Sequence, residues 1–190
     1  MNARTVDVAV FGGSFNPPHI AHLLACAVVL ATESVDQLIV VPTYRHPFAK
    51  ALAPYDDRVA MCRLAMGWLP RVEVSRIEEA LGGESRTLRT LKHLAAEHPE
   101  WRLRIVIGAD VLAEAPRWVG FEAIEKLAPR IVLGRAGFDL PGASPVLPEV
   151  SSTQVRAAIE RGDWDSIASL VPRAVLEYAR AHELYGHEGG

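Results

Sequence analysis

Residues 10–23 read VFGGSFNPPHIAHL, and this stretch decides which fold to expect. It starts in an apolar run, passes through Gly12-Gly13 and Pro17-Pro18, and then enters a segment with helical spacing that carries His19 and His22. Glycines directly after a buried strand let backbone N–H groups approach an anion, and a helix that follows adds the positive end of its dipole. The stretch therefore predicts a strand, a phosphate-binding turn and a helix in direct succession.

Strand-like and helix-like segments alternate through the first two thirds of the chain. Short β-rich runs that are bounded by turn residues occur at Val6–Phe11, Leu38–Val41, Val72–Ser75, Leu103–Ile107 and Ile131–Leu133. Helical spacing occurs at Ile20–Ala31, Asp57–Leu69, Leu88–Glu97 and Phe121–Ala128. This alternation predicts a doubly wound α/β fold, in which helices cover both faces of a mostly parallel, Rossmann-like sheet. Ligands of such sheets bind outside the carboxyl ends of the strands.

The pattern changes after Leu133. Residues 134–150, GRAGFDLPGASPVLPEV, are rich in glycine and proline and predict a loop with at most a short edge strand. Three helical segments then follow, Ser152–Arg161, Trp164–Leu170 and Pro172 to about Glu183. We expect one domain over residues 1–190, with a small helical C-terminal part at about 151–185.

Composition excludes several classes of protein. The chain has 190 residues, is 49% hydrophobic and carries a net charge of −3 that is spread along its length, which argues against nucleic acid and membrane surfaces as partners. Cys26 and Cys62 lie in apolar helical patterns without metal-ligand spacing, so we expect buried thiols in a reducing compartment. No targeting segment or membrane span is visible in the sequence, and a cytoplasmic location is expected.

The two histidines are the first candidates for chemistry. The turn matches neither G-x-G-x-x-G nor G-x-x-x-x-G-K-[ST], which also argues against a dehydrogenase. His19 and His22, three residues apart at the start of a helix that we expect near Pro18, place two imidazoles where both can donate to one phosphate. The alternative is a plain glycine turn and helix start with two surface histidines.

Two further stretches have the chemistry of a nucleotide site. In VSSTQVRAAI, residues 150–159, hydroxyls at a helix start and Arg156 one turn later form a seat for a polyphosphate, or simply a capped helix. In IGADVL, residues 107–112, Gly108 and Asp110 lie where a strand ends. Asp110 either contacts a nucleotide there or caps the following helix.

Together these stretches carry a family resemblance. Gly12 to His22 resembles the signature of the His-x-Gly-His nucleotidyltransferase superfamily, most closely the bacterial nicotinate mononucleotide adenylyltransferase family, with Ala21 where the family usually has glycine. Residues 150–156 resemble its Ile-Ser-Ser-Thr-x-x-Arg motif, and 107–110 its Ile-Gly-x-Asp element. The resemblance implies catalytic roles for His19 and His22, and it predicts that the histidine turn and the hydroxyl-rich segment converge to bind one triphosphate. It implies ATP-binding roles for Gly12, Gly13, Ser14, Phe15, Gly108, Asp110, Ser152, Thr153 and Arg156.

The acceptor site departs further from the family. Trp118 in APRWVGF matches a tryptophan that this family stacks on the pyridine ring, although a core tryptophan is the alternative. The family's Pro-Pro-His-Lys loop is His46-Pro47-Phe48-Ala49-Lys50 here, its Ser-Tyr-Thr element is Ser85-Arg86-Thr87, and Val119 replaces an aromatic residue. A solvated basic loop is the alternative for His46 and Lys50, while Arg86 can attract a carboxylate. The implied acceptor-binding residues are His46, Lys50, Arg86, Thr87 and Trp118.

The resemblance also implies a reaction. AMP passes from ATP to nicotinate mononucleotide, or alternatively to nicotinamide mononucleotide, and gives a dinucleotide of NAD biosynthesis and pyrophosphate. Mg²⁺ arrives with ATP, no metal site made by the protein alone is expected, and a homo-oligomer is compatible with the sequence. The remaining alternatives are a phosphopantetheine-type adenylyltransferase of the same superfamily and a regulatory nucleotide-binding protein without catalysis, for which Ala21 is the only hint.

Overall fold

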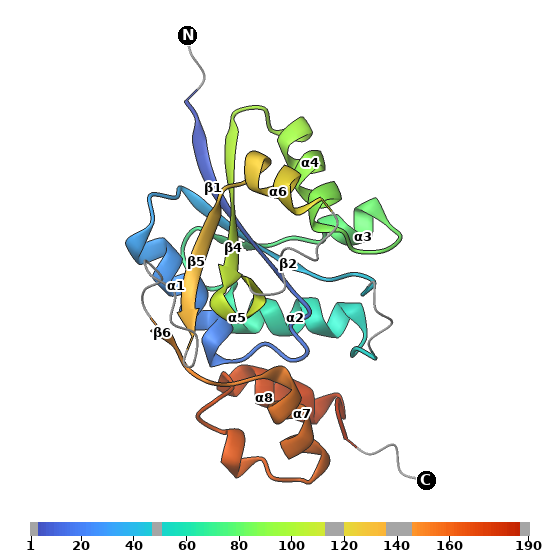
Figure 1. Ribbon diagram of the computed structural model, residues 1–190. Helices are drawn as coiled ribbons and strands as arrows, with labels where there is room; N and C mark the ends of the chain where they lie inside the picture. Colours follow the sequence, from blue (N-terminus) through green and yellow to red (C-terminus); the bar gives the residue numbers. More distant parts are fainter. Residues whose placement is uncertain (1–3, 47–50, 113–119, 136–145, 187–190) are drawn as a thin grey trace.

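The architecture is a single parallel sheet between two layers of helices. A computed structural model describes residues 4–46, 51–112, 120–135 and 146–186. Its six strands lie in the order β3-β2-β1-β4-β5-β6 and every neighbouring pair is parallel (Figure 1). The strands are β1 (Val6–Gly13), β2 (Gln37–Pro42), β3 (Val72–Val74), β4 (Trp101–Gly108), β5 (Arg130–Arg135) and β6 (Val146–Leu147). The predicted doubly wound sheet is confirmed, and β6 is the short edge strand.

Helices cover both faces of this sheet because strand residues alternate between two cores. Ala9 of β1 faces a cluster with helices α1 (Ile20–Thr32) and α2 (Tyr55–Met66), whereas Val8 and Val10 face one with α4 (Thr87–Glu97) and α6 (Phe121–Leu127). In Figure 1, α4 and α6 lie toward the top of the view and α1 and α2 lie below them. Two short helices, α3 (Ile77–Leu81) and α5 (Ala109–Leu112), were not predicted because one turn is too short to show a periodic pattern.

Helix α1 begins where the helical spacing begins. Its first residue is Ile20, as predicted for the segment Ile20–Ala31, and His19, next to the expected start near Pro18, is the extended N-cap with φ −138° and ψ 178°. Proline disfavours the helical conformation in the residue before it, so Pro17 and Pro18 keep the preceding residues extended. The predicted end of α2 at Leu69 was wrong: Pro70 follows, and the helix stops at Met66.

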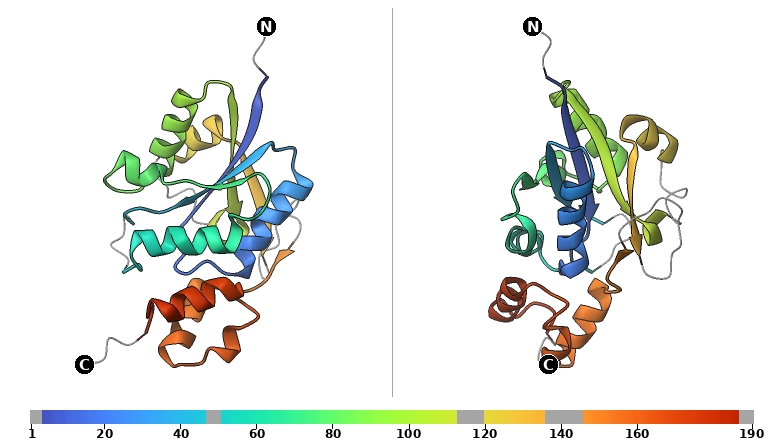
Figure 2. Two further views of the ribbon diagram at one scale, coloured as in Figure 1. Left: turned by 180° about the vertical axis from the view of Figure 1, so that it is seen from behind. Right: turned by 90° about the vertical axis from the view of Figure 1, so that its left-hand side faces the viewer.

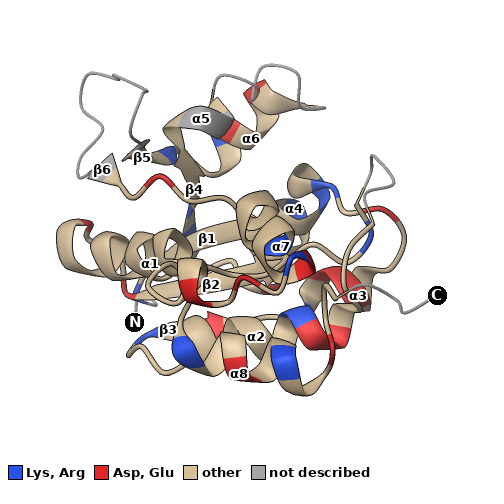
Figure 3. Cartoon of the chain, turned by 90° about the horizontal axis from the view of Figure 1, so that it is seen from below, with Lys and Arg blue, Asp and Glu red and all other residues tan. Residues whose placement is uncertain are grey.

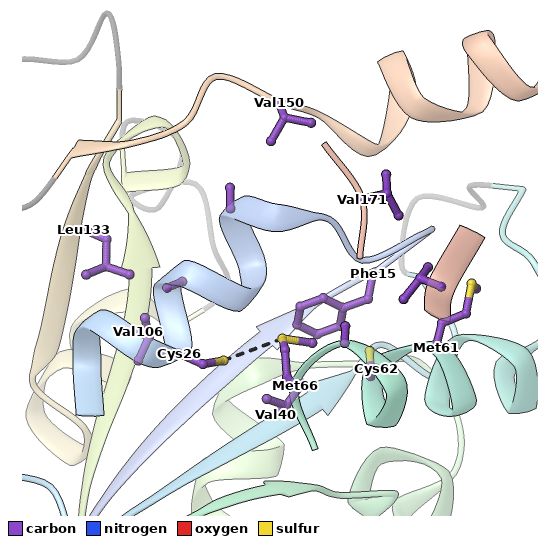
Figure 4. Packing of buried hydrophobic residues seen from close by; sticks show 14 of the residues in the cluster. Phe15, Cys26, Val40, Met61, Cys62, Met66, Val106, Leu133, Val150 and Val171 are labelled. Atoms are coloured by element: carbon purple, nitrogen blue, oxygen red, sulfur yellow. Dashed lines mark hydrogen bonds between the residues drawn. The ribbon is translucent and has the colours of Figure 1, made fainter. Parts of the chain in front are cut away.

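The C-terminal helices lie beneath the carboxyl end of the sheet (Figures 1 and 2). They are α7 (Ser152–Glu160), a short 3-10 helix (Asp165–Ile167) and α8 (Arg173–Ala181). The backbone N–H of Ile20, at the start of α1, donates to the carbonyl of Leu170 at 2.8 Å. Val150 and Val171 belong to the same buried cluster as Phe15 (Figure 4). The C-terminal part is therefore packed against the turn that precedes α1.

Charges of both signs alternate over the lower face of the molecule. Figure 3 shows acidic and basic residues side by side on α2 and α8. Arg173 and Glu177 of α8 form an ion pair of 2.7 Å, one turn apart. Within the described residues, no helix is long and apolar enough to cross a membrane.

Both cysteines are free and buried, as predicted. Cys26 lies on α1 and Cys62 on α2, and burial raises the pKa of the Cys26 thiol to about 12 and that of Cys62 well above its usual value. Cys26 Sγ lies 3.6 Å from the Met66 sulfur inside the cluster (Figure 4). Both thiols therefore stay protonated at neutral pH and act as packing groups.

Candidate active site

The turn after β1 folds back on itself around Phe15. This residue has a positive φ of 46° and is 1% exposed, and its ring projects into the core cluster beside Met66 (Figure 4). A Cβ added to Gly13 would lie 3.0 Å from Phe15 Cζ, so glycine is needed for the ring to approach the backbone. Ala21, which stands where the family usually has glycine, is buried in the same cluster.

The two histidines lie together at the mouth of α1. His19 is 4% exposed, and its ring stacks on that of His22 with 3.8 Å between centroids. The backbone N–H of His19 donates to His22 Nδ1 at 3.1 Å, and the Phe15 ring packs edge-on against His22 at 4.9 Å. Because Nδ1 accepts this bond, neutral His22 carries its proton on Nε2, which becomes the donor nitrogen of the ring.

The start of α7 contacts this turn directly. Ser152 Oγ donates to the carbonyl of Pro17 at 2.8 Å across a separation of 135 residues, and Arg156 Nη1 donates to the carbonyl of Asn16 at 2.7 Å. The prediction that the histidine turn and the hydroxyl-rich segment converge is therefore confirmed.

The hydroxyl groups at the start of α7 make different hydrogen bonds. Ser151 is the N-cap and accepts from the Gln154 N–H at 3.2 Å, while Gln154 Oε1 accepts from the Ser151 N–H at 2.9 Å. The single hydroxyl proton of Ser152 is used in its hydrogen bond to the Pro17 carbonyl. Thr153 Oγ1 accepts from Arg156 at 3.3 Å. For an anion this end presents the backbone N–H groups of the first helical turn, the Thr153 hydroxyl and the Arg156 guanidinium.

Asn16 joins three parts of the chain and was not among the predicted site residues. It is 2% exposed, and its Oδ1 accepts from the Ala53 N–H at 2.9 Å and from the Tyr185 hydroxyl at 3.0 Å. Its carbonyl accepts from Arg156. The residue stands in the signature stretch, but the sequence does not show which distant groups it binds.

Arg58 of α2 is the second residue that sequence reasoning missed. Its side chain is 1% exposed and donates to three backbone carbonyls, those of Ala53 at 2.9 Å, Ser14 at 3.0 Å and Thr43 at 2.7 Å. Burial lowers its pKa. The available signal was its position four residues before Cys62, on the apolar face of the helix.

A buried carboxylate organises the neighbouring loop. Glu78 is 7% exposed, its Oε2 accepts from the Tyr44 N–H at 3.0 Å and from the Ser85 hydroxyl, and its Oε1 accepts from Thr90 at 3.3 Å. The Ser85 N–H in turn donates to the Arg45 carbonyl at 2.9 Å. These bonds bring the loop that carries His46 beside the segment Ser85-Arg86-Thr87.

The remaining acceptor residues are only partly described. Arg86 is the N-cap of α4, where it pairs with Glu84 at 2.7 Å, and Thr87 is the first helical residue. Gly120 has φ +77°, and a Cβ there would lie 2.7 Å from Leu88 Cδ2, so Gly120 lies close to the first turn of α4. Trp118 and Lys50 themselves lie outside the described residues.

Strand β4, which lies next to β1, brings Gly108 to the carboxyl end of the sheet. β4 pairs with β1 and ends at Gly108, as predicted, and Asp110 follows in the first turn of α5, although its side chain lies outside the described part of the structure. Among the residues that the structure describes, no group of three His, Cys, Asp or Glu side chains is placed to hold a metal ion. A site made by the protein alone is therefore not seen in that part of the chain.

Comparison with known proteins shows the family to which this chain belongs. The family described as cytidylyltransferase-like matches residues 10–158. A protein of Anaeromyxobacter dehalogenans named probable nicotinate-nucleotide adenylyltransferase is 48% identical over 183 residues, covering 94% of this chain and 96% of its own. One of Myxococcus xanthus with the same name is 46% identical over 186 residues, with 95% of each chain covered.

A solved structure shares the fold. The nicotinic acid mononucleotide adenylyltransferase of Plasmodium falciparum, complexed with NaAD, superposes with a TM-score of 0.83 at 18% identity, covering 95% of this chain and 97% of the other. The matches in sequence span both the histidine turn and the start of α7. The chain therefore belongs to the cytidylyltransferase-like family and, within it, to the family of the nicotinate-nucleotide adenylyltransferases.

Proposed function

We propose that the protein transfers AMP from ATP to the phosphate of nicotinate mononucleotide, forming the dinucleotide NaAD and pyrophosphate in NAD biosynthesis. The observation that carries this proposal is the contact between the histidine turn and the start of α7, through Ser152 and Arg156. That contact brings imidazole donors and a helix N-terminus to one place, as a triphosphate requires. The names of the relatives and the NaAD in the Plasmodium structure support the same reaction.

The reaction requires no covalent enzyme intermediate. An oxygen of the acceptor phosphate attacks the α-phosphorus of ATP in line, the bond from that phosphorus to the α–β bridging oxygen breaks, and pyrophosphate leaves. His22, with its proton on Nε2, and His19 donate to the phosphoryl oxygens as negative charge builds. Catalysis then consists of positioning and charge stabilisation.

The leaving group is held at the start of α7. We assign the seat to the Ser152 and Thr153 backbone N–H groups, the Thr153 hydroxyl and Arg156, with Gly12, Gly13, Ser14 and Phe15 forming the opposite wall and Gly108 and Asp110 beside the nucleoside. The Ser152 hydroxyl donates to the Pro17 carbonyl, so in this proposal Ser152 contributes its backbone N–H to the seat. Mg²⁺ would arrive bound to the phosphates of ATP and would supply neutralisation of part of the triphosphate charge.

The acceptor lies on the other side of the turn, near α4. His46 and Lys50 contact its phosphate, Thr87 and Trp118 its pyridine nucleoside, and Arg86 its carboxylate. A guanidinium favours a carboxylate over an uncharged amide, which favours nicotinate over nicotinamide mononucleotide. The loop with His46 and the segment with Arg86 are joined through Ser85, so both sides of this pocket are fixed together.

The decisive experiment is a direct comparison of acceptors. The purified protein is incubated with ATP and Mg²⁺ and with nicotinate mononucleotide, nicotinamide mononucleotide or phosphopantetheine, and products and pyrophosphate are separated by chromatography. We expect NaAD to form fastest. A product only with phosphopantetheine would assign the protein to another adenylyltransferase class, and ATP binding without pyrophosphate from any acceptor would make it a nucleotide-binding protein without catalysis.

Glu78 provides a test of the acceptor pocket. Glu78→Gln replaces an acceptor of three bonds with a group that must donate at one oxygen position, and this loosens the contact between Tyr44 and Ser85. We expect the KM for nicotinate mononucleotide to rise about tenfold, while the KM for ATP changes less than about twofold. Glu79→Gln, next to it and paired with Arg76 at the surface, is the matched control and should change neither. An equal rise in both KM values would refute the assignment of this loop to the acceptor.

A further inference from the structure

The end of the described chain returns to the histidine turn. After α8 stops at Ala181, Glu183 and Tyr185 take positive φ angles of 52° and 65°. The turn is closed by the Leu184 N–H, which donates to the Ala179 carbonyl at 2.9 Å. Positive φ is unfavourable for residues other than glycine and persists where the surroundings hold it. At this turn the Tyr185 hydroxyl donates a hydrogen bond to Asn16 Oδ1 at 3.0 Å, which holds the residue in this conformation.

The Tyr185 phenol is held as a hydrogen-bond donor. Its ring packs against the core cluster that contains Phe15, and burial raises its pKa, while the nearby Arg58 and Arg156 charges act in the opposite direction. The hydroxyl therefore keeps its proton at neutral pH. Its acceptor is fixed as well, because Asn16 is 2% exposed and its Oδ1 also accepts from the Ala53 N–H.

Asn16 connects the Tyr185 hydroxyl to the turn that carries the histidines and to Arg156. It lies three residues before His19, and its carbonyl accepts from Arg156 at 2.7 Å. A change in the Asn16 side chain therefore moves the backbone that leads into the histidines and the acceptor that orients Arg156. The geometry points to Tyr185 as a positioning residue: through Asn16 it holds the turn that presents His19 and His22. This inference rests on the adenylyl transfer proposed above.

The chain offers a matched comparison in Tyr178. This tyrosine lies on α8, and its hydroxyl donates to Asp57 Oδ1 of α2 at 2.8 Å. Both tyrosines fasten the C-terminal part to the rest of the molecule by one bond to a side-chain oxygen, but only Tyr185 bonds to the histidine turn. A merely structural role predicts the same consequences for the loss of either hydroxyl, whereas a positioning role predicts different ones.

The test compares Tyr185→Phe with Tyr178→Phe in the full chain. We expect Tyr185→Phe to lower kcat about tenfold with both KM values within about twofold of wild type, and Tyr178→Phe to leave kcat within about twofold. Thermal unfolding of each variant measures the structural part separately. An unchanged kcat in Tyr185→Phe, or an equal loss in both variants, would overturn the inference.

Two further measurements test whether the effect of Tyr185 passes through Asn16 and whether it alters the imidazoles. In an Asn16→Ala background, Tyr185→Phe should change kcat by less than about twofold, since its bonding partner is gone. A full tenfold loss in that background would show that Asn16 is not the route. Long-range ¹H–¹⁵N spectra of the imidazoles, recorded without substrate, should show shifted His19 and His22 signals in Tyr185→Phe alone. Because these spectra need no turnover, failure of the proposed reaction and failure of this inference are distinguishable.

Discussion

His22→Ala is expected to lower kcat about a hundredfold or more, while the Kd of ATP rises less than about threefold. The reason is that Nε2–H, whose position is fixed by the bond from the His19 N–H to Nδ1, acts on charge that is greatest in the transition state. Single-turnover kinetics and equilibrium titration with ATP measure the two quantities separately. His93→Ala, on the outer face of α4 where it pairs with Glu97, is the control and should leave both unchanged.

Two substitutions of His22 distinguish the roles of its two ring nitrogens, Nδ1 and Nε2. Asparagine places an acceptor near Nδ1 and keeps the bond from the His19 N–H, but it has no donor at the position of Nε2. Glutamine places its amide donor near that position. We expect His22→Asn to be as slow as His22→Ala and His22→Gln to recover part of the loss. If asparagine recovered the activity, the histidine would serve the turn and not the phosphate.

Arg58→Met should produce the largest loss of stability. Methionine fills much of the same volume but leaves the carbonyls of Ser14, Thr43 and Ala53 buried without this donor. Because removing the partner of buried polar groups costs their desolvation, the free energy of unfolding should fall by roughly 2–5 kcal/mol. Urea denaturation followed by circular dichroism gives this value.

Arg63→Met, on the exposed face of the same helix, is the control for Arg58. We expect it to change the free energy of unfolding by less than about 0.5 kcal/mol. Equal stability of the Arg58 and Arg63 variants would show that water or another group replaces the guanidinium, and Arg58 would then not hold the three loops together. Arg58→Lys should lose most of the same stability, because an ammonium group lacks the planar fork that spans three carbonyls.

The sheet and the main helices could be predicted because their signals are local. Apolar runs such as Leu38–Val41 and the helical spacing of Leu88–Glu97 lie within one or two residues of the observed β2 and α4. The boundary error at the end of α2 occurs where a neighbour overrides the pattern, because Pro70 follows the shortened helix. One-turn helices such as α3 have no period to detect.

The site could be predicted only as two converging segments. Motif chemistry and a family resemblance were enough to bring the histidines and Arg156 together. They did not indicate that the Ser152 hydroxyl is taken by Pro17, or that Arg58, Glu78 and Tyr185 hold the surrounding loops. These bonds join residues that are far apart in the chain, and nothing near Glu78 or Tyr185 in the sequence specifies the partner.

The closure of the histidine turn by distant residues also sets an order for biosynthesis. Translation produces the turn before its partners, because Arg156 and Tyr185 lie 140 and 169 residues beyond Asn16. A growing polypeptide that has emerged from the ribosome only as far as β5 has a histidine pair with no partner for the Asn16 carbonyl or side chain from α7 or the last turn. The protein should therefore begin to bind ATP only once α7 and α8 have docked. Bound ATP should then stabilise the completed fold.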